Sequence, residues 1–168
     1  MAPILTILFK QWMKPEPQEP PMDLLVIGYG NTLRRDDGVG PKVAEAVAKL
    51  ALPGVRALAC LLLTPELAEA VSQTRVVIFV DAAVDAPREV QMRKLVPTET
   101  SQVMAHAANP ATVLALARDV FGHIPEACWL TIPVEDLRLG EELSPLAQRG
   151  FERAVQEIRK WAGEPRNR

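Results

Sequence analysis

The chain has 168 residues, a typical length for one domain, and its 19 basic and 21 acidic residues give a formal net charge of −2. Because neither sign of charge forms a long run, we expect no nucleic-acid partner. No apolar run approaches the ~20 residues that a membrane-spanning helix requires, so we expect no membrane segment.

The first 21 residues differ in composition from the rest of the chain. Residues 4–9 are apolar, but they lack the preceding basic residue and the following cleavage site of a signal peptide. Residues 14–21 contain four prolines and cannot form a regular element. We therefore predict a proline-rich appendage at 1–21, a single α/β domain at 22–163 and a short tail at 164–168, with Met22 as a candidate start of translation.

From residue 22 onward, short apolar runs alternate with segments that have helical periodicity. The predicted strands lie at 24–27, 55–63, 76–80, 89–95 and 128–132, and helices are predicted to begin near 41, 65, 110 and 145. The run 55–63 is interrupted only by Arg56 and predicts a well-buried strand, whereas the alternation in 89–95 predicts an edge or antiparallel strand. Fully apolar strands alternating with helices predict a three-layer αβα sandwich with a mainly parallel central sheet.

Three of the helices share a start signal, a Thr, Asn or Ser N-cap followed by proline: Thr64-Pro65, Asn109-Pro110 and Ser144-Pro145. In the helix after Asn109, the positions predicted to share one apolar face are Val113, Leu114, Ala117, Val120 and Phe121. The two cysteines, Cys60 and Cys128, lie in apolar runs without the spacing of a zinc or redox motif. We expect both to be buried and reduced in a cytoplasmic protein, and we expect a monomer.

A glycine-rich stretch, GYGNTLRRDDGVG at 28–40, connects the first strand to the first helix. Four glycines in thirteen residues suit a tight turn or a close approach of another group to the backbone. Within the stretch, Asp36 and Asp37 stand side by side. On local features alone, a solvated loop with one aspartate capping the helix is an equally good interpretation.

Ligands of open parallel sheets bind outside the carboxyl ends of the strands. The residues that this rule selects are Asp36 and Asp37 after the first strand, Asp81 at the end of the third, and His106 before the helix at 110. Two carboxylates and an imidazole at one edge would suit a divalent transition ion, although His106 taken alone is better explained as a loop histidine. The other candidates, His123 at a helix end and the acids Asp85, Glu135 and Asp136, are interpreted as structural or solvated residues.

A nucleotide site and ordinary hydrolase motifs have weaker support. Leu33 stands where a dinucleotide loop would have its third glycine, and no acid closes the second strand to bind a ribose. The chain also has no phosphate loop with a lysine, no G-x-S-x-G and no H-E-x-x-H.

The pattern G-x-G-N-x-L-x-x-D-D-G-x-G at 28–40, the strand ending in Asp81-Ala82, and His106 ahead of the helix at 113–117 resemble the [NiFe]-hydrogenase maturation endopeptidases. The resemblance extends from about Met22 to Trp161. It implies an enzyme that removes the C-terminal extension of the hydrogenase large-subunit precursor after nickel insertion. It further implies nickel ligands at Asp37, Asp81 and His106, with the nickel supplied by the precursor.

The chain departs from the family at two places. Some members carry glutamate where Asp37 stands, and some have a glycine-rich loop where this chain has Leu61-Leu62-Leu63-Thr64-Pro65-Glu66. The sequence is compatible with two mechanisms: the metal polarises the scissile carbonyl, or Asp37 or Asp81 activates a water as general base. Two other functions are alternatives, a Rossmann-like module that binds a nucleotide or metabolite, and a nickel-sensing chaperone that does not cleave.

Overall fold

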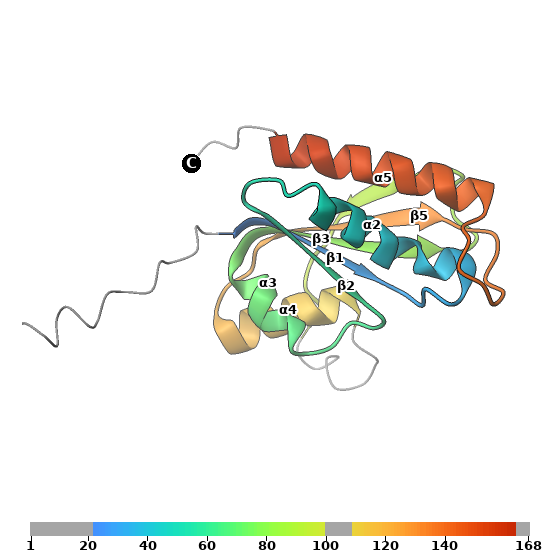
Figure 1. Cartoon of the computed structure of the whole chain (residues 1–168). Coiled ribbons are helices and arrows are strands. Elements are labelled where there is room, and N and C mark those ends of the chain that lie inside the picture. The colour runs from blue at the N-terminus through green and yellow to red at the C-terminus, as the bar shows by residue number, and fades with distance from the viewer. Residues whose placement is uncertain (1–21, 100–108, 164–168) are drawn as a thin grey trace, which may run out of the picture.

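The structure, a computed structural model, describes residues 22–99 and 109–163 (Figure 1). The elements in chain order are β1 (Met22–Tyr29), η1 (Arg35–Gly38), α2 (Val39–Lys49), β2 (Val55–Cys60), α3 (Leu67–Ser72), β3 (Thr74–Ala83), β4 (Gln91–Lys94), α4 (Pro110–Phe121), β5 (Glu126–Pro133) and α5 (Pro145–Gly163). None of the helices in this part of the chain combines the length and apolarity of a transmembrane span.

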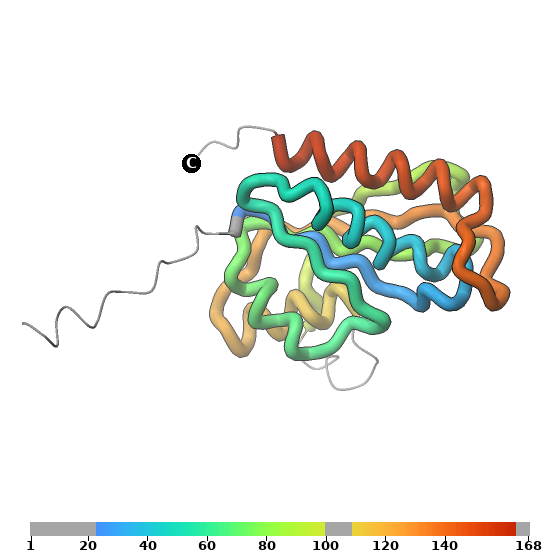
Figure 2. The backbone as a smooth tube through the Cα atoms, viewed as in Figure 1, coloured from blue at the N-terminus to red at the C-terminus, as the bar shows by residue number. Residues whose placement is uncertain are grey.

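The five strands form one sheet in the order β2-β1-β3-β5-β4. The first four are parallel, and β4 runs antiparallel to β5 at the edge. The predicted mainly parallel sheet and the predicted antiparallel edge strand at 89–95 are both confirmed. The tube in Figure 2 follows the chain from β1 out to β2 and then back across β1 to β3.

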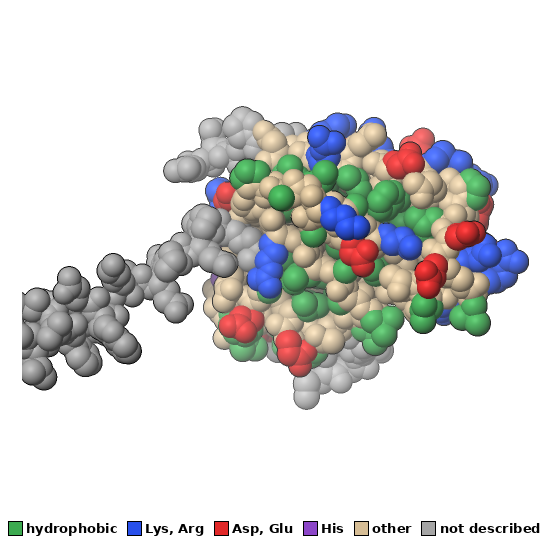
Figure 3. Space-filling view, viewed as in Figure 1, with side chains coloured by type: hydrophobic (Ala, Val, Ile, Leu, Met, Phe, Trp, Pro, Cys, Tyr) green, Lys and Arg blue, Asp and Glu red, His purple; other side chains and the backbone are tan. Residues whose placement is uncertain are grey.

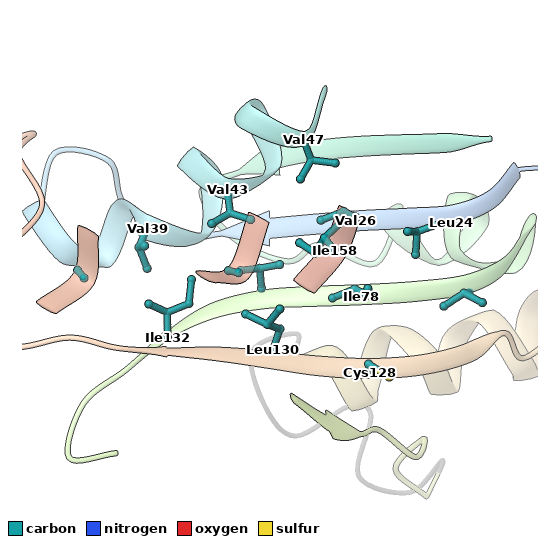
Figure 4. Close-up of a cluster of buried hydrophobic side chains, with 14 of the residues drawn as sticks. Leu24, Val26, Val39, Val43, Val47, Ile78, Cys128, Leu130, Ile132 and Ile158 are labelled. Carbon is teal, nitrogen blue, oxygen red and sulfur yellow. The ribbon is translucent and has the colours of Figure 1, made fainter. Parts of the chain in front are cut away.

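Helices cover both faces of the sheet, α2 and α5 on one and α3 and α4 on the other (Figure 1). Because successive strand residues point to opposite faces, neighbouring residues of β1 belong to different cores. Val26 packs with Val43 and Ile158 under α2 and α5 (Figure 4), whereas Ile27 packs with Leu114 on the α4 side. This is the predicted three-layer αβα sandwich.

Two of the three predicted helix starts are confirmed. The Asn109 side chain accepts a hydrogen bond from Thr112 N at 2.9 Å, and Ser144 Oγ accepts one from Ala147 N at 3.2 Å. The third is wrong, because Thr64 and Pro65 belong to a turn and α3 begins only at Leu67. Backbone bonds such as Leu67 N to Thr64 O, 3.1 Å long, satisfy that turn without a side-chain cap.

The predicted burial is wrong at two places. β2 is an edge strand that ends at Cys60, which is half-buried, and Leu61 and Leu62 beyond it are 59% and 67% exposed. An edge strand has one neighbouring strand instead of two, so an apolar run does not by itself show that a strand lies inside the sheet. In α4, Val120 and Phe121 are exposed although they continue the apolar periodicity, since a helical pattern does not reveal whether anything packs against the last turn.

Candidate active site

The glycines of the 28–40 stretch allow the start of α2 to pack directly against the sheet. A Cβ added to Gly28 would lie 2.0 Å from Gly40 O, and one added to Gly40 would lie 2.6 Å from Val80 O. Only hydrogen at these positions permits such contact between backbones. The packing fixes η1, the short helix that carries both aspartates, close to the carboxyl ends of β1 and β3.

Asp36 is completely buried and holds loops together. Its carboxylate accepts hydrogen bonds from Ser144 N at 2.6 Å, Ser144 Oγ at 2.7 Å, and the backbone amides of Glu135 and Asp136 at 3.0 Å each. These donors outweigh the desolvation that opposes them and lower the pKa of Asp36. The interpretation of the stretch as a solvated loop with a capping aspartate is therefore wrong for Asp36, whose role is structural.

The prediction that Asp136 is a solvated loop acid is wrong. Its side chain is only 14% exposed and forms ion pairs with Arg138 at 2.6 Å and Arg35 at 3.1 Å. The bonds from Arg138, followed by the charge of Arg35, hold the pKa of Asp136 well below its usual range. Asp85 and Glu135 are exposed, as predicted.

Asp81 lies at the carboxyl end of β3, as predicted, and its carboxylate accepts a 2.6 Å hydrogen bond from the Tyr29 hydroxyl. Tyr29 ends β1, and the register Gly28↔Val80 places the two residues side by side on adjacent strands. Burial, followed by the charge of Asp81, raises the pKa of Tyr29 far above its usual range, so Tyr29 is a neutral donor. Tyr29 is not among the site residues predicted from the sequence, although its place after Gly28 at a strand end was a signal that could have identified it.

Asp37 is half-buried and accepts a hydrogen bond from Asn31 N at 3.0 Å through Oδ2. Burial raises the pKa of Asp81, and the negative charge of Asp37 raises it further. The hydrogen bond from Tyr29 lowers the pKa of Asp81. The structure thus places Asp37 and Asp81 at the same sheet edge, and the charge of Asp37 disfavours the ionised form of Asp81. Two carboxylates in this arrangement suit a divalent cation, which would offset the repulsion.

His106 lies outside the described residues, so the three-residue ligand set remains a prediction. Within 22–99 and 109–163, no group of three or more His, Cys, Asp and Glu side chains could hold a metal ion. The direction of α4 can be inferred from its far end, where His123 Nε2 lies 3.3 Å from Thr74 O at the start of β3. Asn109, at the other end of α4, is therefore directed toward the carboxyl edge that carries Asp81. The contact also supports the structural interpretation of His123.

Two surface hollows lie away from the acid pair. One, of about 580 Å³, lies between α2 and α5 and is lined by Lys42, Glu45, Ala46, Lys49, Glu141, Glu142, Leu143, Gln148 and Phe151. The other, of about 420 Å³, is lined by residues of α5 and of the segment before β4, including Arg88 and Arg149. Neither hollow includes Asp37 or Asp81. Figure 3 shows basic, acidic and hydrophobic side chains mixed over the side of the molecule that has α5 at the top and α3 and α4 below, without a field of one sign.

Comparison with known proteins identifies the fold. No protein-family model and no curated protein matches the chain. Among solved structures, a [NiFe] hydrogenase maturation protease, HycI, from Thermococcus kodakarensis KOD1 superposes with a TM-score of 0.67 at 23% identity, over 85% of this chain and 94% of that one. The hydrogenase maturating endopeptidase HybD from E. coli gives 0.63 at 22% identity, over 82% and 90%. A hydrogenase 2 maturation peptidase from Thaumarchaeota archaeon SCGC_AB-539-E09 gives 0.63 at 24%, over 84% and 98%. The chain has the fold of these proteins over nearly their whole length.

Proposed function

We propose that this protein is an endopeptidase that removes the C-terminal extension of the [NiFe]-hydrogenase large-subunit precursor after nickel insertion. The observation that carries the proposal is the pair Asp37 and Asp81 at the carboxyl edge of the sheet. The pair occurs on a fold shared with solved structures named as hydrogenase maturation proteases. The nucleotide-binding and chaperone alternatives have no comparable support.

We assign to Asp81 the role of general base. The Tyr29 hydroxyl donates to Oδ2 of Asp81 and fixes the orientation of the carboxylate. Asp81 would take a proton from a water as the water oxygen attacks the scissile carbonyl carbon, and the proton would then pass to the departing amine. Asp37, held by Asn31 N, would face the same reacting groups from η1.

The nickel of this reaction belongs to the substrate. Asp37, Asp81 and His106 would contact the ion that the precursor carries, and the ion would bring the scissile bond to the acid pair. The two carboxylates would attract the cation of a nickel-loaded precursor and would lack that attraction to an empty one, which would give recognition by differential affinity. We further propose that the enzyme acts as a monomer in the cytoplasm.

The decisive experiment is incubation of the purified protein with nickel-loaded precursor, followed by mass measurement of the precursor C-terminus. We expect loss of the C-terminal extension with the wild-type protein. Asp81→Asn keeps the shape and one acceptor oxygen but removes the charge, so cleavage should fall by orders of magnitude while folding is retained. Binding of the precursor without any cleavage would indicate a chaperone instead.

A second experiment tests the source of the nickel. We expect the purified enzyme to contain far less than one equivalent of metal and to leave nickel-free precursor uncleaved. Metal content is measured by inductively coupled plasma mass spectrometry before the precursor is added. Stoichiometric metal in the isolated enzyme, or efficient cleavage of nickel-free precursor, would contradict this assignment and indicate an ordinary metallopeptidase.

A further inference from the structure

Four leucines are exposed in loops at the carboxyl edge of the sheet. Leu33 follows β1 and is 59% exposed, Leu61 and Leu62 follow β2 at 59% and 67%, and Leu139 follows β5 at 83%. We call these four residues the leucine rim. Single exposed leucines need no explanation, but several gathered beside a candidate site indicate an interaction surface.

Backbone hydrogen bonds join the three loops of the leucine rim. Gly30 N donates to Cys60 O at 3.2 Å, which places the loop that begins at Gly30 beside the start of the Leu61–Leu62 segment. Gly140 N donates to Leu33 O at 2.9 Å, so Leu33 and Leu139 flank one backbone contact. The three loops that carry the leucine rim are therefore joined to one another by backbone hydrogen bonds.

The rim is also connected to the acid pair. Asn31 N donates to Asp37 Oδ2 at 3.0 Å, and the Asn31 side chain accepts from Leu33 N at 2.9 Å. One residue thus holds Asp37 with its amide and the backbone of Leu33 with its side chain. The loop that carries Leu33 therefore borders Asp37 directly.

Two arginines in the same loops form hydrogen bonds or ion pairs within the protein. Arg34 Nε donates to Leu137 O at 3.3 Å, and Arg138 pairs with Asp136 at 2.6 Å. The leucines are instead directed outward, with more than half of each exposed. The surface next to Asp37 therefore offers apolar area to an incoming chain.

We propose that the leucine rim binds apolar side chains of the precursor on one side of the scissile bond and thereby selects the cleaved sequence. This inference rests on the proposed function, because an endopeptidase must hold an extended segment across its acid pair. Three extended residues span roughly 10 Å, so the side chains that the rim would bind are those within a few residues of the scissile bond. The occupant is the precursor chain itself, since the rim is continuous with the loop that holds Asp37.

The test replaces Leu61 and Leu62 with serine and measures cleavage of nickel-loaded precursor. We expect the double variant L61S/L62S to raise KM about tenfold or more while kcat changes less than about twofold, because the lost contact acts on binding. A second variant, L33S/L139S, should act in the same direction. The matched control is V120S/F121S, whose residues are 66% and 46% exposed at the other end of the molecule and should leave KM unchanged.

Thermal unfolding of each variant separates a binding effect from a folding effect, and we expect midpoints close to that of the wild type. A reciprocal arm replaces the apolar precursor residues nearest the cut with serine, which should remove the difference between wild type and L61S/L62S. Wild-type cleavage together with an unchanged KM in both rim variants would overturn the inference and leave the proposed function intact. Absence of cleavage by the wild type would overturn the proposed function, and the inference with it.

Discussion

Asp36 and Asp37 are adjacent in sequence, and the structure predicts opposite consequences when each is changed to asparagine. Asp36 is fully buried and accepts four hydrogen bonds between 2.6 and 3.0 Å, which join η1 to the segment after β5 and to the start of α5. Asp37 is half-buried and accepts one, from Asn31 N. We therefore expect Asp36→Asn to reduce stability and Asp37→Asn to reduce cleavage.

The size of the Asp36 effect follows from its bonds. A hydrogen bond to a charged group contributes about 1.5–3 kcal/mol, and four would contribute about 6–12 kcal/mol if every donor stayed unsatisfied. Glu135 is exposed, so water can reach part of this segment, and Asp36→Asn retains one acceptor oxygen. Because part of this hydrogen bonding is kept, we expect a loss of about 3–5 kcal/mol, roughly half of that sum or less. In a domain of this size that loss lowers the unfolding midpoint by roughly 10 °C.

The assay is urea and thermal unfolding of three variants with the wild type. Asp37→Asn should lose at most about 1 kcal/mol, because a single half-exposed bond is affected. Ser144→Ala removes one of the bonds to Asp36 and the cap of Ala147 N, and it should give an intermediate loss. Equal stability of Asp36→Asn and wild type, or an equally large loss in Asp37→Asn, would refute the division of roles.

Three further changes test other parts of the structure. Gly40→Ala places a methyl group 2.5 and 2.6 Å from backbone carbonyl oxygens of neighbouring strands and should destabilise the fold by about 2–4 kcal/mol in urea unfolding. The control Gly163→Ala, which has open space around it, should have little effect. Equal stabilities of the two variants would show that the backbones around Gly40 can separate freely. Tyr29→Phe removes the hydroxyl that orients the candidate base, so kcat should fall about tenfold or more with KM little changed, and an unchanged kcat would exclude an orienting role. The pKa of Asp136 is lowered in the folded protein, and the largest cause is the hydrogen bonds from Arg138. The ionised Asp136 therefore stabilises the fold above the ordinary aspartate pKa of about 3.9, and this stabilisation is lost as the pH falls toward the lower pKa of the folded state. The difference in unfolding midpoint between wild type and Asp136→Asn should accordingly shrink below about pH 4, and a constant difference down to pH 2 would contradict this cause.

The layers of the fold could be predicted because they depend on local patterns. A fully apolar run such as 76–80 can only be covered on both faces, and this run is β3, in the middle of the sheet. Asn109 and Ser144 cap their helices with their own side chains, so their helix starts are encoded within four residues. Thr64 is also a common N-cap residue and is also followed by proline, yet the turn there forms its hydrogen bonds through the backbone. A cap signal thus predicts a helix start only when no turn competes with it.

The burial of β2 could not be predicted, because strand order is a property of the whole sheet. Residues 55–60 have an apolar composition similar to that of an inner strand, but β2 is at an edge and half-exposed. The exposed Leu61 and Leu62 follow from this position. The same reasoning explains why Cys60 is half-buried while Cys128, on the inner strand β5, is buried.

For the site, the rule about carboxyl ends of strands correctly brought Asp37 and Asp81 to one edge. It could not separate Asp36 from Asp37, because the difference arises from Ser144 and the backbone at 135–136, about one hundred residues later. Tyr29 was missed for a related reason: its partner Asp81 is 52 residues away, and only the pairing of β1 with β3 makes them neighbours. Side-chain roles that depend on long-range register are not visible in a local motif.

The long glycine-rich stretch combines structural and chemical roles, which explains why its local features fit two interpretations equally well. Gly28 and Gly40 allow two backbones to touch, and Asp36 ties η1 to distant loops. The glycines contribute packing and Asp36 contributes hydrogen bonds, and together they determine where η1 lies. Asp37, with its carboxylate held by Asn31 N, is the residue that this framework presents at the sheet edge. Much of the stretch therefore positions η1, and with it Asp37, at the edge that carries Asp81, so a change in either glycine should also displace Asp37.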